Sequence, residues 1–310
     1  MNKNDFDILR WKNFHKENDL NLKKINQYVS KNSGWKSINK CPICDSIRKK
    51  ILFKKFGINI LNCLSCNHIY SHKAPKNIQD AYSNNFHQRQ SLKSYDSIRK
   101  FRINRFAKER INLILKYKKN GNFLDYGCGT GWLIEHAKSK FKNIEGYEPT
   151  KKLAEITSKK LNINVFNDFR NRRSNKYDII TLYDVIEHIL NPKKFVNDIH
   201  KMMNKNALLV IYTPNSASIS FDYLKEKSNL IIPPLHLHFF NYDSLNHLLK
   251  KNFKILYTET KGFDIGDIYS YQKEKNIKTF VKNFKDMETI QDNLDNMFLG
   301  NHIRFILKKR

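Results

Sequence analysis

Residues 123–131 of this 310-residue chain read FLDYGCGTG, an apolar run that passes directly into three glycines. The run fits a buried strand, and the glycines fit a turn where backbone approaches a ligand closely. Apolar residues continue at helical spacing over 132–140. The start of that helix would offer unpaired N–H groups and a positive dipole end to a carboxylate or phosphate. The stretch therefore predicts an α/β fold with a ligand at its first strand–helix turn.

Alternating strands and helices follow this turn. Strands are predicted at 143–148, 164–166, 177–184, 207–214, 253–260 and 302–308, and helices at 151–161, 192–204 and 243–251. Alternation at this spacing predicts a largely parallel, doubly wound sheet. Another helix is expected over 95–119, leading into the first strand. A Lys-rich stretch at about 273–297 is expected to form a helical insert, either a lid or a dimer contact.

Four of the five cysteines form two tight pairs ahead of the sheet. They follow the pattern C-x2-C-x18-C-x2-C and comprise Cys41, Cys44, Cys63 and Cys66. This spacing is typical of a four-thiolate zinc site, in which each pair supplies two sulfurs to one ion. A shell of four thiolates leaves no open position, so the zinc would be structural. We expect the nearby His68 to lie on the surface.

Charge and composition narrow the class of protein. The chain has 57 Lys and Arg against 29 Asp and Glu, a net charge of +28, of which +19 lies in the first 120 residues. A hydrophobic fraction of 40% excludes wholesale disorder. The excess charge indicates either an anionic partner, such as nucleic acid or a phosphorylated substrate, or the composition bias of a low-GC genome.

The N-terminal residues predict no signal peptide. It reads MNKNDFDILR, with acids and no apolar stretch, and no run of about 20 apolar residues occurs in the chain. We expect a cytoplasmic protein that does not insert into a membrane and whose cysteines stay reduced.

The glycine pattern separates two families of nucleotide-binding proteins. A dinucleotide fingerprint would need glycine where Trp132 stands. The observed G-x-G-x-G with a preceding acid instead resembles motif I of class I S-adenosylmethionine (SAM) methyltransferases. The resemblance extends over 122–310 and implies a Rossmann-like sheet of seven strands.

This resemblance implies roles for individual residues. In the family, an acid before the glycines holds the methionine amino group, an acid ending the second strand binds the ribose, and an acid after the third strand meets the adenine. The implied cofactor-binding residues are Asp125, Gly127, Gly129, Gly131, Glu148, Asp168 and Tyr183. Phe166 or Phe169 would flank the adenine ring.

A second block refines the resemblance. Residues 177–188 read YDIITLYDVIEH and resemble the fourth-strand region of ubiquinone and small-molecule O-methyltransferases. In that group an acid–x–x–Glu–His cluster binds a divalent cation, which implies a Mg²⁺ site at Asp184, Glu187 and His188. The cysteine module, followed by Tyr70, resembles ribbon-bearing methyltransferases of sugar and surface-polysaccharide pathways.

These resemblances divide the chain into three predicted parts. They are a helical extension over 1–40, a zinc-ribbon module over 41–94 and a class I methyltransferase domain over 95–310. A homodimer is compatible with this organisation.

Methylation of a hydroxyl calls for a base, because an alcohol is a poor nucleophile at neutral pH. Three histidines are predicted in loops beyond the carboxyl ends of strands, where open α/β sheets bind ligands. We rank His236 and His238 slightly above His188 as the base. The alternative for His188 is a residue at a helix start bonded to backbone, and the alternative for His236 and His238 is packing.

Three functions compete. The leading hypothesis is methyl transfer from SAM to a small molecule, most specifically a hydroxyl of a sugar or nucleotide sugar in saccharide biosynthesis. The second is a zinc-ribbon RNA methyltransferase acting on rRNA bases, which the basic N-terminal part favours. It is weakened by a ribbon with only Phe53 and Phe56 between its cysteines for stacking. The third is a scaffold that binds SAM without catalysis.

Overall fold

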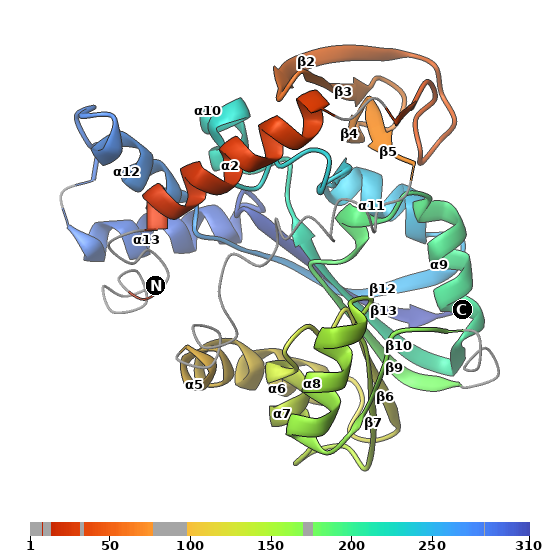
Figure 1. The fold of residues 1–310 in the computed structure, drawn as a ribbon. Coiled ribbons are helices and arrows are strands. Elements are labelled where there is room, and N and C mark those ends of the chain that lie inside the picture. The colour runs from red at the N-terminus through yellow and green to blue at the C-terminus, as the bar shows by residue number, and fades with distance from the viewer. Residues whose placement is uncertain (1–7, 9–13, 32–33, 77–97, 170–175, 282) are drawn as a thin grey trace.

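The computed structural model describes residues 8, 14–31, 34–76, 98–169, 176–281 and 283–310 (Figure 1). A seven-stranded sheet in the order β12-β13-β10-β9-β6-β7-β8 forms its centre. The strands are β6 (Asn122–Tyr126), β7 (Asn143–Tyr147), β8 (Asn164–Phe166), β9 (Tyr177–Tyr183), β10 (Met203–Pro214), β12 (Phe253–Lys261) and β13 (His302–Lys309). Only β13 runs antiparallel to its neighbours. The predicted Rossmann-like sheet of seven strands is confirmed.

Helices cover both faces of this sheet. On one face α6 (Lys108–Leu115) and α7 (Trp132–Ala137) bury apolar side chains against β6, β9 and β10. On the other face α9 (Pro192–Lys201) and α11 (Tyr242–Leu249) do the same. α8 (Lys151–Leu161) packs near the edge strand β8 and its neighbour β7. Figure 1 shows α9 and α11 on the opposite side of the sheet from α6 and α7.

The predicted helix over 95–119 falls into segments. They are α5 (Arg99–Arg102), one turn of π-helix over Ile103–Ala107, and α6. Together they lead into β6. Residue 95 and its neighbours up to 97 lie outside the described residues.

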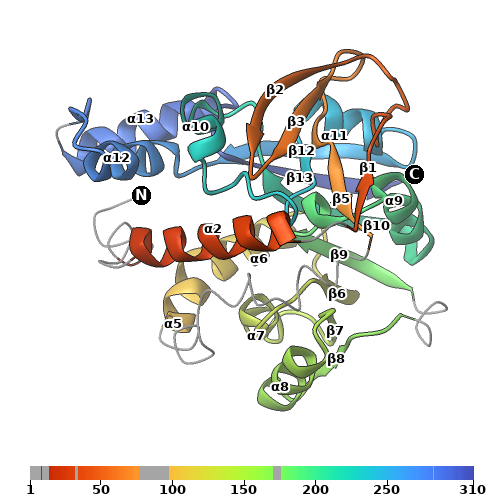
Figure 2. The same cartoon turned by 45° about the horizontal axis from the view of Figure 1, so that its top comes forward.

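The ribbon is a four-stranded sheet in the order β11-β4-β3-β2. β2 (Lys49–Lys55), β3 (Ile58–Cys63) and β4 (Ile69–Ser71) come from the cysteine region. β11 (His238–Phe239) comes from the methyltransferase region and pairs antiparallel with β4. Figure 1 shows this ribbon above α11, and Figure 2 shows the long α2 (Phe14–Lys31) below the ribbon. A two-stranded sheet of β1 (Trp35–Ser37) and β5 (Lys73–Pro75) lies beside it.

The predicted helical insert at 273–297 is two helices rather than one. α12 (Asp264–Glu274) is nearly complete before the predicted start, and α13 (Phe284–Asn296) occupies the rest. Asn276 adopts a left-handed φ of 52° just after α12, which ends the helix. Asn283 caps α13 by accepting a hydrogen bond from the Asp286 N–H.

Short elements complete the described chain. They are the 3₁₀ turn η3 (Ile186–His188), α10 (Ile219–Leu224) and the 3₁₀ turn η4 (Lys225–Lys227). Within the described ranges, none of the helices combines the length and apolar character needed to cross a bilayer.

Candidate functional site

The glycine loop between β6 and α7 adopts left-handed backbone geometry. Gly129 and Gly131 adopt φ angles of 53° and 73°. A Cβ on Gly131 would lie 2.5 Å from the Leu161 side chain, so that glycine is required for packing. A Cβ on Gly129 would meet nothing within 4 Å. The open side of Gly129 is where a ligand can approach the backbone.

Glu148, at the end of β7, ties this loop to the start of α8. One carboxylate oxygen accepts a hydrogen bond from the Gly129 N–H at 3.2 Å, and the other accepts from the Thr150 N–H at 2.9 Å. Burial raises the pKa of the Glu148 carboxyl, and these two backbone donors oppose that rise. The Glu148 carboxylate therefore lies beside the glycine loop, and its binding of the ribose stays a prediction.

Asp125 lies deeper than its predicted role suggests. Its side chain is buried and accepts a hydrogen bond from the Thr181 hydroxyl at 2.7 Å. Burial raises the pKa of Asp125 to about 6, while Thr181 and the charge of Arg110 oppose the rise.

The predicted adenine side carries aromatic rings. Phe166 and Phe169 pack edge to face at 4.9 Å, and Phe169 stacks on Tyr126 at 5.2 Å. Asp168 is exposed beside them, immediately before the undescribed residues 170–175. These residues form one corner of the carboxyl edge of the sheet.

Arg110 of α6 is a site residue that the sequence analysis missed. Its side chain is 7% exposed, and its guanidinium lies over the rings of Tyr183 at 4.1 Å, Tyr212 at 4.8 Å and Trp132 at 5.0 Å. Among the residues that the structure describes, no hydrogen bond or ion pair satisfies it. The Tyr183 hydroxyl, also buried, has no hydrogen-bond partner in the same ranges. A buried cation of this kind fits an anionic group of a ligand.

His302 is a second missed residue. It begins β13, and because β13 is antiparallel to β10, it stands opposite Pro214 at the carboxyl end of β10. Its ring stacks on Tyr212 at 4.8 Å, and its Nε2 lies 3.6 Å from the Asp184 carboxylate. Knowledge that the last strand is antiparallel would have directed attention to it.

The predicted base His238 lies in the seam between ribbon and domain. Its Nε2 donates to the Ile189 carbonyl at 2.8 Å, so its Nδ1 accepts from His68 Nε2 at 3.0 Å. Both histidines are fully buried, and burial lowers the pKa of His238 to about 4. His68 was expected on the surface and is not there. Both ring nitrogens of His238 are therefore occupied.

The other two predicted bases form a cluster with Glu187. His188 Nδ1 donates to the Leu235 carbonyl at 2.8 Å, and His236 Nδ1 donates to the Leu230 carbonyl at 2.6 Å. Ligating atoms of Glu187, His188 and His236 all lie within 4.8 Å of one another.

This cluster differs from the implied Mg²⁺ site. The structure brings His236 to Glu187 and His188, whereas Asp184 faces His302. Two imidazoles and one carboxylate suit a transition-metal ion better than Mg²⁺, which prefers oxygen ligands.

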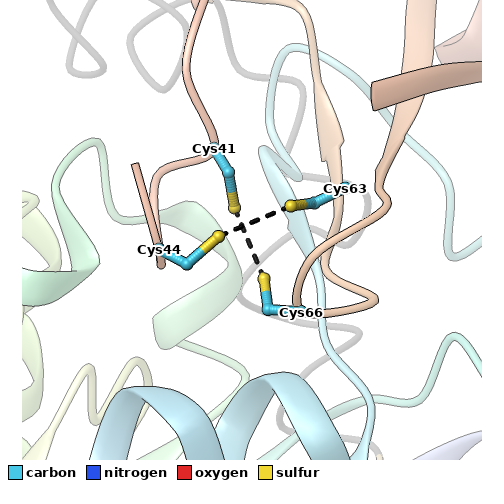
Figure 3. Close-up of side chains that lie close together, drawn as sticks. All are labelled: Cys41, Cys44, Cys63 and Cys66. Carbon is cyan, nitrogen blue, oxygen red and sulfur yellow. Dashed lines mark hydrogen bonds between the residues drawn. The ribbon is translucent and has the colours of Figure 1, made fainter. Parts of the chain in front are cut away.

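The four ribbon cysteines converge as predicted (Figure 3). Sulfur–sulfur distances are 3.6 Å for Cys41–Cys66 and 3.5 Å for Cys44–Cys63, and all four sulfurs lie within 4.8 Å. A tetrahedron with zinc–sulfur bonds of about 2.3 Å has edges of about 3.8 Å. The geometry fits zinc, with only small movements of the side chains.

Comparison with known proteins shows which protein family the chain matches. The family model described as "Methyltransferase domain" matches residues 98–257, just over half of the chain. The ubiquinone biosynthesis O-methyltransferase of Pelagibacter ubique is 26% identical over 130 residues. That match covers 38% of this chain and 54% of the relative, so the chain spans about half the length of the curated relative it matches.

Two solved structures are similar to the chain at low sequence identity. A SAM-dependent methyltransferase from Thermotoga maritima, named a possible histamine N-methyltransferase, has 16% identity and a TM-score of 0.48, covering 75% of this chain and 98% of that one. A SAM-dependent methyltransferase from Archaeoglobus fulgidus has 17% identity and a TM-score of 0.46, covering 70% and 99%. At these scores the likenesses bear on neither substrate nor partner.

Proposed function

Because the chain belongs to the family of SAM-dependent methyltransferases, we propose that it transfers a methyl group from SAM to a hydroxyl of a sugar or nucleotide sugar. We place this reaction in saccharide biosynthesis in the cytoplasm. The observation that carries the cofactor part is the Gly129 backbone, open to a ligand on one side and bonded to the Glu148 carboxylate on the other.

Each of the cofactor-binding residues would contact a different part of SAM. Glu148 would accept hydrogen bonds from the ribose hydroxyls, and Asp168 with Phe169 would meet the adenine. The glycine loop would run beside the methionine part, with Asp125 beneath it. When bound, SAM supplies an electrophilic methyl: the C–S bond breaks as the new C–O bond forms, and its electron pair stays on sulfur.

We assign Arg110 to an anionic group of a ligand. Its guanidinium is held by three rings at the carboxyl ends of β9 and β10 and at the start of α7. The cofactor carboxylate and the phosphate of a nucleotide sugar both have the chemistry that such a group takes. Its aromatic surroundings keep the charge fixed in place before a ligand arrives.

The acceptor proposal rests on the curated relative and on charge. That relative is named as an O-methyltransferase, which favours oxygen as the methylated atom. The net charge of +28 would steer a phosphate-bearing acceptor toward the protein.

We propose mainly structural roles for the seam histidines. His238 has no ring nitrogen left to take a proton, since Ile189 and His68 occupy both. His188 and His236 hold the 230–235 loop through its carbonyls. The zinc implied at the ribbon cysteines would hold the strand that pairs with β11, and so would hold this loop indirectly.

A transfer assay tests the proposal. Methyl-labelled SAM is supplied with nucleotide sugars, quinol precursors or total RNA, and Glu148→Gln serves as the cofactor-deficient control. We expect label in a nucleotide sugar with the wild type only. Label confined to quinol precursors or RNA would contradict the saccharide acceptor.

Binding of S-adenosylhomocysteine, measured by calorimetry, tests the cofactor part separately. Absence of binding would contradict the whole proposal.

One observation bears on the RNA alternative. Lys49, Lys50 and Lys54 are exposed on β2, the edge strand of the ribbon sheet. Lysines at an edge also prevent strands of other chains from pairing there, which explains them without RNA. Affinity for RNA that falls in log K by about 0.7–0.9 per contacted phosphate in log salt would favour the alternative.

A further inference from the structure

The side chains of His302 and Asp184 are more exposed than the carboxylate of the cluster formed by Glu187, His188 and His236. The side chains of His302 and Asp184 are 19% and 51% exposed, whereas the Glu187 side chain is 1% exposed. An acceptor hydroxyl must reach the atom that takes its proton. The His302–Asp184 pair is therefore more accessible to an acceptor than the carboxylate of the seam cluster.

Hydrogen bonds fix which nitrogen of His302 carries the proton. The Asn301 side-chain amide donates to Asp267 at 3.2 Å, so its oxygen faces the other way. That oxygen accepts from the Phe263 N–H at 3.3 Å and lies 2.8 Å from His302 Nδ1. An oxygen can only accept, so Nδ1 must carry the hydrogen and Nε2 must hold a lone pair.

The lone pair is directed toward Asp184. The Nε2 atom lies 3.6 Å from the Asp184 carboxylate, beyond hydrogen-bond distance. A hydroxyl that donates to Nε2 would stand beside a carboxylate able to stabilise the imidazolium formed once the proton has moved.

Resting on the proposed function, we propose that His302 Nε2 is the base that accepts the acceptor's hydroxyl proton, with Asn301 and Asp267 as positioning residues. The proton moves from oxygen to Nε2 as the oxygen takes the methyl group from the sulfonium. Both electron pairs are accounted for, since the O–H pair becomes the nucleophile's and the C–S pair stays on sulfur.

A continuous series of contacts joins His302 to the glycine loop. His302 stacks on Tyr212, Tyr212 lies under the Arg110 guanidinium, and Arg110 lies over Trp132, the residue after Gly131. The seam histidines instead bond to Leu230, Leu235 and Ile189 or to His68 of the ribbon. This series of contacts connects His302 with the start of α7, directly after the glycine loop.

The charged groups around His302 come from three parts of the fold. Asp184 follows β9 and Asp267 lies in α12, and both favour the protonated ring, while Arg110 of α6 and burial disfavour it. The balance lowers the pKa of His302 below its ordinary value. A neutral ring at neutral pH is the form that a base needs.

The helical insert, formed by α12 and α13, holds Asn301 in place. The Asp264 carboxylate at the start of α12 accepts hydrogen bonds from the Asn301 N–H at 2.7 Å and from Gln291 of α13 at 3.1 Å. Asp267 of the same helix orients the Asn301 amide. The two helices therefore hold the residue that sets the tautomer of His302.

Nitrogen-15 NMR of histidine-labelled protein tests the tautomer without an acceptor. We expect the His302 signals to report hydrogen on Nδ1, with His302→Gln identifying them by their loss. Asn301→Ala should shift the ring toward the Nε2–H form. Asp267→Asn, a milder change on the same chain of bonds, should give a mixture. An Nε2–H ring in the wild type would overturn the proposal.

Kinetics test the base with the nucleotide sugar that the wild type methylates. We expect His302→Gln to lower kcat by about 10²- to 10⁴-fold, the usual contribution of a general base, with KM changed little. His200→Gln, at the far end of α9, is the matched control and should leave kcat unchanged. A larger loss of kcat in His236→Gln or His188→Gln than in His302→Gln would overturn the proposal.

Calorimetry with S-adenosylhomocysteine tests the proposed base and the proposed function separately. Unchanged affinity in His302→Gln, together with the loss of kcat, supports the base. Loss of cofactor binding in the wild type would refute the proposed function, while the tautomer experiment would still read out His302 by itself.

Discussion

Two groups of histidines stand at the same edge of the sheet and are built in opposite ways. His68, His188, His236 and His238 bond to backbone carbonyls or to each other in the seam beneath the ribbon. His302 bonds to one side-chain amide and directs its other nitrogen toward an exposed carboxylate. The first group joins two parts of the protein, and the second is available to a substrate.

The two groups differ in the hydrogen-bond partners that their buried rings have. A buried imidazole must satisfy its N–H, and a backbone carbonyl from a distant segment does so while fixing that segment in place. The seam rings thus stabilise the fold. Among the residues that the structure describes, His302 forms a hydrogen bond through Nδ1 only, which leaves Nε2 for chemistry.

Removing the zinc should have the largest effect on stability. It should disturb the histidines of the seam and leave His302 unchanged. Cys63→Ser, or a strong chelator, should remove one zinc per chain, measured by elemental analysis. Structural zinc contributes on the order of 10 kcal/mol to folding of small metal-bound units, so the ribbon should open. We expect hydrogen exchange to rise along β4 and β11, while the His302 tautomer is retained. A chain isolated without zinc would contradict the ribbon.

Acid should weaken the seam next. Burial holds the pKa of His238 at about 4 in the folded protein, against about 6.5 when unfolded. The unfolded chain therefore binds the proton first, so stability is full above about pH 6.5 and is lost as pH falls toward 4. This shift corresponds to a loss of about 3 kcal/mol of folding free energy, which urea unfolding at different pH values would measure. His238→Gln should reduce the dependence of the free energy of unfolding on pH. An unchanged dependence would contradict the assigned role of His238.

Glu148→Gln should separate cofactor binding from both histidine groups. Hydrogen bonds to a charged group contribute about 1.5–3 kcal/mol, so affinity for S-adenosylhomocysteine should fall by roughly 10- to 100-fold. Glu226→Gln, on the exposed turn η4, is the control and should bind normally. Equal affinity in both variants would refute the assigned role of Glu148.

The smallest effect is expected at the ion pair between the ribbon and α9. Lys193 Nζ lies 2.5 Å from the Asp45 carboxylate, but both side chains are well exposed. Exposed pairs contribute about 0–1 kcal/mol, so Lys193→Ala should barely alter the unfolding midpoint. A loss comparable to that of the zinc ligands would mean that charge, not apolar burial, holds the ribbon.

Local patterns predicted the frame of this molecule well. The strands of the sheet, the glycine loop with Glu148, and the four cysteines each have a signal within a few residues, namely periodicity, left-handed turns and paired spacing. Contacts between distant segments have no such signal. The pairing of β11 with β4, which moved His238 into the seam, joins residues 170 positions apart.

The missed site residues have the same physical explanation. Arg110 looks like one more surface charge on an amphipathic helix until three rings from other elements close around it. His302 matters because an antiparallel strand brings its first residue to the carboxyl edge. Neither fact is encoded near the residue itself.

The shared strand β11 also bears on modularity. Tyr70, Leu61 and the ribbon cysteines pack in the same apolar core as α9, α11 and the central sheet. A catalytic domain cut free of the ribbon would present that apolar surface together with the unpaired edge of β11. The ribbon is therefore not a transferable cassette, and its loss or exchange would require matching changes in the 230–240 segment of the domain that carries it.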